Sequence, residues 1–119
     1  MMVSIANKEE KNFFLNNLFV GSQIESLIAH LDSCTSIQFQ PNSSVLCSSS
    51  HDCSLRFWNT DKFSSSQTEG AGVAHAACVQ ELGGHRKVFN EGVNDLSFNN
   101  EGTLFASGGA DGSIKLYYR

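Results

Sequence analysis

The sequence predicts an all-β fold in which short strands are joined by polar turns. The chain has 119 residues, among them nine phenylalanines, ten glycines and one proline, a composition that favours strands and tight turns. No segment shows the apolar periodicity of a long amphipathic helix. Two segments, residues 35–58 and 94–117, also repeat each other at a constant offset of 59 residues.

The repeat preserves both apolar and polar positions. The matched pairs are Ile37 and Leu96, Phe39 and Phe98, Ser48 and Ser107, Asp52 and Asp111, Ser54 and Ser113, Arg56 and Lys115, and Trp58 and Tyr117. Upstream of each copy, a small residue precedes a histidine, at Ala29-His30 and Gly84-His85. Because the spacing between these positions is the same in both segments, each copy is expected to form one supersecondary unit.

Each copy is expected to contain three strands. They are placed at 34–39, 45–49 and 54–58 in the first copy, and at 93–98, 103–107 and 113–118 in the second. In the first strand, Ile37 and Phe39 alternate with polar residues, as a half-buried strand requires. A fourth strand is expected at 76–82, and 23–28 takes the same role before the first copy. Residues 60–75, rich in Ser and Gly, look like a flexible loop.

Charge, hydropathy and cysteines exclude several classes of function. Twelve acidic against eight basic residues give a net charge of −4, which disfavours nucleic-acid binding. No apolar run is long enough to insert into a membrane, and no secretory signal is recognised. The four cysteines are therefore expected to be reduced thiols, and the protein cytoplasmic. Cys47, His51 and Cys53 lack the spacing of zinc ligands, so no metal and no cofactor is expected.

The repeated pattern resembles a known family. A small residue with histidine, a strand that ends in Phe-x-Pro at 39–41, a Ser-x-x-x-Asp motif at 48–52 and a strand that ends at Trp58 are similar to the WD repeat of β-propellers. The terminal Trp-Asp pair of the family is Trp58-Asn59 in the first copy and Tyr117-Tyr118 in the second.

The resemblance implies an incomplete WD-repeat β-propeller whose ring is not closed. WD repeats are about 40–45 residues long and propellers usually have four to eight blades, so this chain is expected to supply about two and a half blades of four strands. Residues 1–28 would be the last strands of a preceding blade, 29–82 a blade with the 60–75 insert, and 83–119 a final blade that lacks its outer strand. The open edges are expected to favour self-association.

Several segments more closely resemble the C-terminal repeats of the striatin family. Residues 29–32, 50–56 and 58–59 are similar to its penultimate repeat, 78–82 and 85–87 to the entry of the last repeat, 106–111 to a stretch near its C-terminus, and 13–17 to the end of an earlier repeat. The resemblance implies a non-catalytic, protein-binding scaffold for assemblies of type 2A phosphatase, Ste20-like kinases and Mob-type adaptors. Phosphatase binding is not carried over, since the helical region that holds the phosphatase in the family has no counterpart in these residues.

In WD repeats, a histidine, a serine, an aspartate and an aromatic residue form a hydrogen-bonded tetrad. The corresponding residues are His30, Ser48, Asp52 and Trp58 in the first copy, and His85, Ser107, Asp111 and Tyr117 in the second. A tyrosine hydroxyl lies farther from its ring than an indole N–H, which weakens the prediction of a fourth link in the second set.

Serine, histidine and aspartate are also the residues of a hydrolytic triad. A structural role is preferred here, because the trio occurs twice at matched spacing and no Gly-x-Ser-x-Gly elbow is present. No catalytic residue is therefore expected, and the protein is not expected to be an enzyme.

The loops next to the tetrads are expected to share one rim, with the 60–75 insert on the opposite rim. On the first rim, His51, Arg86, Lys87 and Ala110 are candidates for a protein-binding surface, with plain solvated loops as the alternative. Two other functions are kept open: an adaptor from another WD-repeat family, or a truncated gene fragment without independent activity.

Overall fold

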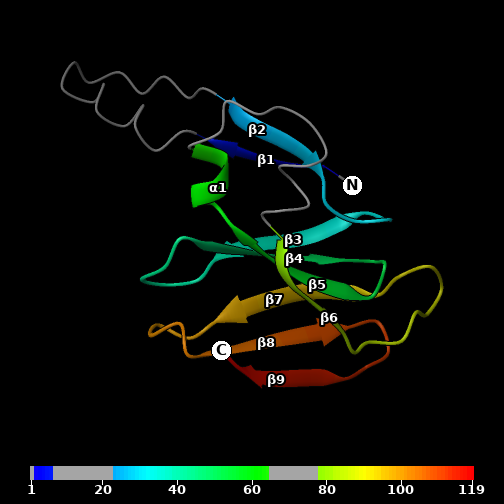
Figure 1. The fold of residues 1–119 in the computed structure, drawn as a ribbon. Helices are drawn as coiled ribbons and strands as arrows, with labels where there is room; N and C mark the ends of the chain where they lie inside the picture. Colours follow the sequence, from blue (N-terminus) through cyan, green and yellow to red (C-terminus); the bar gives the residue numbers. More distant parts are fainter. Residues whose placement is uncertain (1, 7–22, 65–77) are drawn as a thin grey trace, which may run out of the picture.

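The computed structural model describes residues 2–6, 23–64 and 78–119, and these form three antiparallel sheets (Figure 1). The elements are β1 (Met2–Ala6), β2 (Gln23–Ile28), β3 (Cys34–Phe39), β4 (Val45–Ser50), β5 (Ser54–Asn59), α1 (Asp61–Ser64), β6 (Cys78–Gly83), β7 (Val93–Phe98), β8 (Leu104–Gly109) and β9 (Ile114–Tyr118). The prediction of an all-β, open assembly of strands is confirmed.

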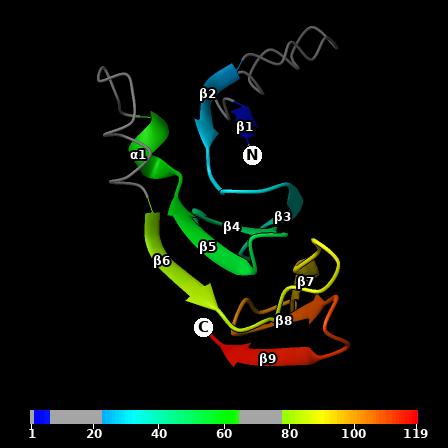
Figure 2. The ribbon, with the colours of Figure 1, turned by 90° about the vertical axis from the view of Figure 1, so that its right-hand side faces the viewer.

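The sheets follow the order of the sequence. β1 pairs with β2, the strands β3-β4-β5-β6 form a four-stranded meander, and β7-β8-β9 form a three-stranded one. Figure 2 shows the second and third sheets stacked one below the other. The six strands expected in the two copies are present within one or two residues of the expected bounds, and so are the strands at β2 and β6.

Two features of the fold differ from the prediction. The last strands of a blade were expected within residues 1–28 but no strand was placed at β1 itself, and the first residues of the insert form the short helix α1 instead of a loop. Asp61 favours this helical turn, because an acidic residue interacts well with the free backbone N–H groups of a first turn. The remainder of the predicted loop and the 13–17 segment lie outside the described residues.

The core lies between the second and third sheets. It is formed by one face of β3–β6 against one face of β7–β9, and its buried members are Cys47, Leu55, Phe57, Val93, Leu96, Phe98 and Phe105. The rings of Phe57 and Phe105 meet edge to face with centroids 5.1 Å apart. Phe105 in turn stacks on Tyr117 at 4.7 Å. Aromatic contacts between the two copies therefore hold the sheets together.

Matched residues of the first strands differ in exposure. Leu96 in β7 is 5% exposed, whereas its counterpart Ile37 in β3 is 50% exposed. Phe39 is likewise an exposed residue and Phe98 a buried one. The cause is position in the stack: the alternation in β3 puts Ile37 and Phe39 on the face that points away from β7–β9. The alternation was thus predicted correctly, but the burial of Ile37 and Phe39 was overestimated.

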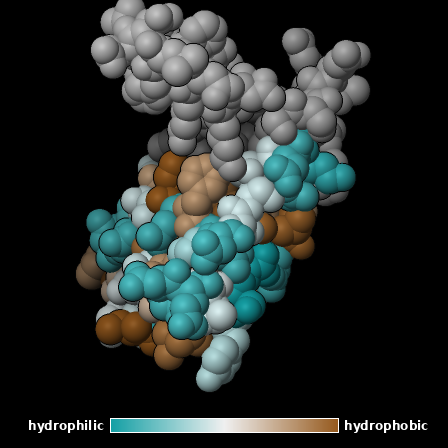
Figure 3. All heavy atoms as spheres, turned by 90° about the vertical axis from the view of Figure 1, so that its left-hand side faces the viewer, coloured by the Kyte–Doolittle hydropathy of each residue, from teal (hydrophilic) through white to brown (hydrophobic). Residues whose placement is uncertain are grey.

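The opposite asymmetry is found in the third strands. Leu55 and Phe57 of β5 are buried against the third sheet, while their counterparts Ile114 and Leu116 of β9 are exposed. Figure 3, which faces the rim near α1, shows hydrophobic residues at the lower edge of the molecule, where β9 lies in Figure 1. An apolar face that is covered in the first copy is thus open in the second.

The turn between β4 and β5 contains a left-handed residue that is not glycine. Cys53 has a φ of 72°, and its counterpart in the second copy, Gly112, has a φ of 78°. We expect Cys53→Gly to raise the free energy of unfolding by about 1 kcal/mol, because only glycine adopts this conformation without steric cost. Urea denaturation followed by circular dichroism measures the change.

The matched control is Gly112→Ala. The space around Gly112 is open, so that substitution tests the backbone alone, and it should lower stability by a similar amount. A Cys53→Gly variant that is less stable than the parent would show that the thiol contributes more than the strained backbone costs.

Candidate functional site

The first tetrad forms a continuous chain of hydrogen bonds. The Nδ1–H of His30 donates to Oδ2 of Asp52 at 3.0 Å, and the hydroxyl of Ser48 donates to the other ring nitrogen at 2.7 Å. Ser48 Oγ accepts from the indole Nε1–H of Trp58 at 2.9 Å. We assign this tautomer because the carboxylate can only accept. The chain thus connects the loop before β3 with strands β4 and β5.

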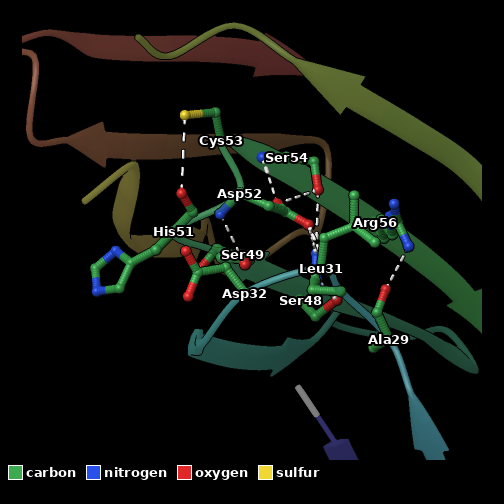
Figure 4. Close-up of polar contacts among 12 residues, drawn as sticks. Ala29, Leu31, Asp32, Ser48, Ser49, His51, Asp52, Cys53, Ser54 and Arg56 are labelled. Carbon is green, nitrogen blue, oxygen red and sulfur yellow. Dashed lines mark hydrogen bonds and ion pairs between the residues drawn. The ribbon is translucent and has the colours of Figure 1, made fainter. Parts of the chain in front are cut away.

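Asp52 lies at the tip of the turn between β4 and β5 and collects several donors (Figure 4). Its carboxylate accepts from Ser54 Oγ at 2.6 Å, from Ser54 N at 2.9 Å and from Leu31 N at 3.1 Å. Burial alone would raise the pKa of Asp52, but these hydrogen bonds outweigh it and lower the pKa to about 2. Burial also lowers the pKa of His30, in spite of the opposing effect of Asp52.

These two shifts predict a loss of stability in acid. Both groups have a lower pKa in the folded chain than when unfolded, so the unfolded state binds protons first as the pH falls. The free energy of unfolding should decrease as the pH falls below 6.5, because the unfolded chain protonates His30 before the folded chain does. It should decrease a second time between pH 3.8 and about 2, for the same reason at Asp52. The Asp52 step corresponds to about 2 kcal/mol. Urea midpoints at pH 7.5, 5, 4 and 3 measure the His30 step and the upper half of the Asp52 step.

Asp52→Asn is the control for the lower step. This variant has no carboxylate to titrate at position 52, so the fall between pH 4 and 3 should be smaller than in the parent. A urea midpoint that stays constant from pH 7.5 to pH 3 in the parent would contradict the assignment.

The second tetrad repeats three of the four members. His85 contacts Asp111 through Nδ1 at 3.1 Å and Ser107 through Nε2 at 2.7 Å. Asp111 accepts from Arg86 N at 2.9 Å and from Ser113 Oγ at 2.7 Å, and these contacts lower its pKa. No hydrogen bond joins Tyr117 to Ser107 in the described part of the chain; its ring instead stacks on the core.

The serines of both sets are poorly placed for nucleophilic attack. Ser48 and Ser107 are buried residues, and the hydroxyl of Ser48 lies between an imidazole and an indole. A nucleophilic serine has to face its substrate with an activated hydroxyl. The geometry can do something else: it fixes the aspartate-bearing turns to the strands through buried, mutually satisfied polar groups.

The candidate rim residues belong to the connections β4–β5, β6–β7 and β8–β9, and these connections lie together at the right in Figure 1. Gly92 connects two of them, because its N–H donates to His51 Nδ1 at 3.2 Å and its carbonyl accepts from Ala110 N at 2.8 Å. Lys87 Nζ forms an ion pair with Asp32 at 3.1 Å. This rim therefore joins loops from both copies, and α1 lies at the opposite end of the strands.

Gly92 is the residue of the rim that sequence reasoning missed. A Cβ atom at this position would lie 2.7 Å from His51 O and 2.8 Å from Cys53 N, so no other residue fits without movement of the backbone. A glycine directly before the first strand of the second copy was the available signal.

Arg119 was also missed, on the opposite rim. Its guanidinium lies 4.3 Å from the ring centroid of Phe57 and donates to Gln80 Oε1 at 2.7 Å. The backbone N–H of Arg119 donates to Thr103 O at 2.7 Å. Arg119, directly after β9 of the third sheet, thus contacts strands β5 and β6 of the second sheet.

The described residues form neither a metal site nor a membrane-spanning helix. Within the described residues, no group of three or more His, Cys, Asp or Glu side chains is arranged to hold a metal ion. In the same part of the chain, no helix has the length and hydropathy to cross a membrane. The four cysteines are free thiols, and burial raises the pKa of Cys47 to about 12.

Comparison with known proteins places the two copies in one family. The family model described as "WD domain, G-beta repeat" matches residues 21–59 and 76–117. Human striatin-3 is 37% identical over 115 residues, and human striatin is 38% identical over 117; each alignment covers 97% of this chain and 13% of the relative. Human striatin-4 is 36% identical over 104 residues, which are 87% of this chain and 12% of the relative. The chain thus spans about one eighth of the length of these relatives.

Proposed function

Since the chain belongs to the WD-repeat family, we propose that it is a non-catalytic scaffold module that binds proteins in assemblies of the striatin type. In such an assembly it would contribute contacts to Ste20-like kinases or Mob-type adaptors. The similarity to three striatins over most of the chain supports this assignment. The rim formed by His51, Arg86, Lys87 and Ala110 is the proposed contact surface.

The observation that carries the proposal is that loops from both copies contact each other at this rim. Loops that are far apart in the sequence are held together by Gly92 and by the ion pair between Lys87 and Asp32. Hydrogen bonds from Ser33 N and from Lys87 lower the pKa of Asp32, and so favour the carboxylate form that pairs with Lys87. A surface whose loops are fixed before binding loses less entropy when a partner docks.

The experiment uses the whole chain and purified candidate partners. Wild-type protein and the double variant Arg86→Glu, Lys87→Glu are tested against a Ste20-like kinase and a Mob-type adaptor by biolayer interferometry. We expect the double variant to bind at least about tenfold more weakly, because two rim charges are reversed. The control is Lys62→Glu in α1, an exposed charge on the opposite side of the molecule.

Two outcomes would count against the proposal. If neither partner binds the wild-type chain, the assembly role fails. If a partner binds and the rim variant retains its affinity, the contact surface lies elsewhere.

A second proposal is self-association through the exposed face of β9. The face that carries Leu55 and Phe57 in the first copy is covered by a sheet of the second copy, so the matched face of Ile114 and Leu116 fits a sheet from another copy of the chain. Light scattering should show a wild-type oligomer that Leu116→Glu converts to a monomer. A wild-type monomer at all concentrations would contradict this.

A further inference from the structure

The connection between β6 and β7 contains a tight two-residue turn. Val88 N donates to Glu91 O at 2.8 Å and Glu91 N donates to Val88 O at 2.9 Å. The two residues between them, Phe89 and Asn90, have φ values of 50° and 67°. Two successive left-handed residues are typical of the type I′ turn, in which Asn and Gly are the preferred residues.

Phe89 is an unfavourable residue for this position. A bulky side chain in the left-handed region is sterically costly, and burial against the described residues does not compensate for the cost, because Phe89 is 95% exposed. Backbone strain of this kind is often found where a residue serves a function. The strain and the exposure together favour an external contact for this side chain.

The residues on both sides of this turn are fixed by contacts with other loops. Gly92, next to its C-terminal end, is hydrogen-bonded to His51 in one loop and to Ala110 in another. On the other side, Lys87 is paired with Asp32. Figure 1 shows the connection reaching beyond the ends of the strands. Phe89 is therefore presented on a rigid support and does not sit in a loose connector.

A second apolar side chain lies on the same rim. Leu31 follows the histidine of the first tetrad, its N–H is bound to Asp52, and it is 92% exposed. Its neighbour Asp32 pairs with Lys87, two residues before Phe89, which brings the two segments together. The rim thus offers two exposed apolar side chains, one from each copy, on backbones that hydrogen bonds hold in place.

We propose that Phe89 and Leu31 are the anchors by which the rim captures an apolar peptide segment of another protein. This inference rests on the proposed function and assigns the contact within it. Exposed aromatic residues on preorganised loops carry a large share of binding energy in interfaces. A protein segment fits better than an anionic membrane, because the basic residues Arg86 and Lys87 of the rim are balanced by Asp32 and Glu91, and the chain has a net charge of −4.

The experiment uses a random twelve-residue peptide library displayed on phage as the probe. Peptides are selected on the immobilised wild-type chain, and the best ones are synthesised and titrated by fluorescence polarisation. We expect peptides rich in aromatic and aliphatic residues whose affinity falls at least about tenfold on Phe89→Asn and on Leu31→Ala. Val79→Ala, at an exposed apolar residue of β6 that belongs to neither proposed contact surface, is the matched control and should retain the affinity.

Phe89→Asn also tests the strain directly. Asparagine tolerates the left-handed conformation, so this variant should melt about 3 °C or more above the wild type while it loses peptide binding. A lower melting temperature would mean that the phenylalanine supports the fold, and would overturn the inference.

The remaining outcomes separate this inference from the proposed function. If selected peptides lose affinity on Arg86→Glu, Lys87→Glu but not on Phe89→Asn, the rim binds without the anchor and only the inference fails. If no peptide is selected, or if all retain their affinity on every rim variant, the inference fails, whereas the proposed function is decided by the binding of the purified kinase and adaptor. Phe89-dependent binding to phosphatidylserine vesicles instead of peptides would overturn the assignment of a protein partner.

Discussion

Replacing Phe57 with alanine should lower the free energy of unfolding by about 3–5 kcal/mol, the largest single loss that we expect in this chain. Phe57 is fully buried, and its ring contacts those of Phe98 and Phe105 across the boundary between the second and third sheets. The truncation would remove the buried ring and leave a cavity where the two copies meet. Urea denaturation followed by circular dichroism measures the loss.

The internal repeat supplies the control for this experiment. Leu116 occupies the matched position in the second copy and is 70% exposed in the single chain, so Leu116→Ala should change the stability of the monomer by no more than about 0.5 kcal/mol. Equal losses in the two variants would contradict the difference in burial between the matched faces.

Ser48→Ala should be the second most harmful substitution, with a loss of about 2–4 kcal/mol. The hydroxyl of Ser48 donates to His30 and accepts from Trp58, and all three side chains are buried. Its removal breaks the hydrogen bonds to the His30 imidazole and to the Trp58 indole N–H, and each buried group that loses such a bond costs about 1–3 kcal/mol. The same denaturation experiment applies, with the fluorescence of the single tryptophan as a second signal.

Ser107→Ala is the matched variant for this prediction. Ser107 is hydrogen-bonded to His85, but no link to an aromatic donor is present within the described residues. Its removal therefore leaves one group without a partner, and we expect a loss of about 1–2 kcal/mol. If the two serine variants lose the same amount of stability, the bond from Trp58 to Ser48 contributes nothing measurable.

The strands were predictable because their signals are local. In β3 and β7, apolar residues alternate with polar ones, and a polar turn follows each strand, so both bounds could be placed from the sequence. The members of the first tetrad could also be named, since the family pattern fixes their spacing. What could not be read from residue types was which copy of a matched pair is buried: Phe57 and Leu116 look equivalent until their positions in the stack are known.

The missed features depend on contacts between distant segments. Gly92 is important because it lies against His51 and Ala110, and Arg119 because it reaches Phe57. Neither contact follows from local periodicity. The strained turn at Phe89 was not predicted for a different reason. Its sequence, Val-Phe-Asn-Glu, contains no glycine that would have indicated a left-handed backbone.

The junction at Gly92 has a thermodynamic consequence. Since loops from both repeats meet there, a ligand that spans the rim would bind only the arrangement in which the two sheets are packed together. Binding and packing are then linked, and each must strengthen the other by the same free energy. A mutation deep between the sheets would weaken ligand affinity without touching the ligand, and a ligand at the rim would raise the melting temperature of the whole pair. The affinity of a rim ligand would therefore measure how stably the two repeats pack against each other.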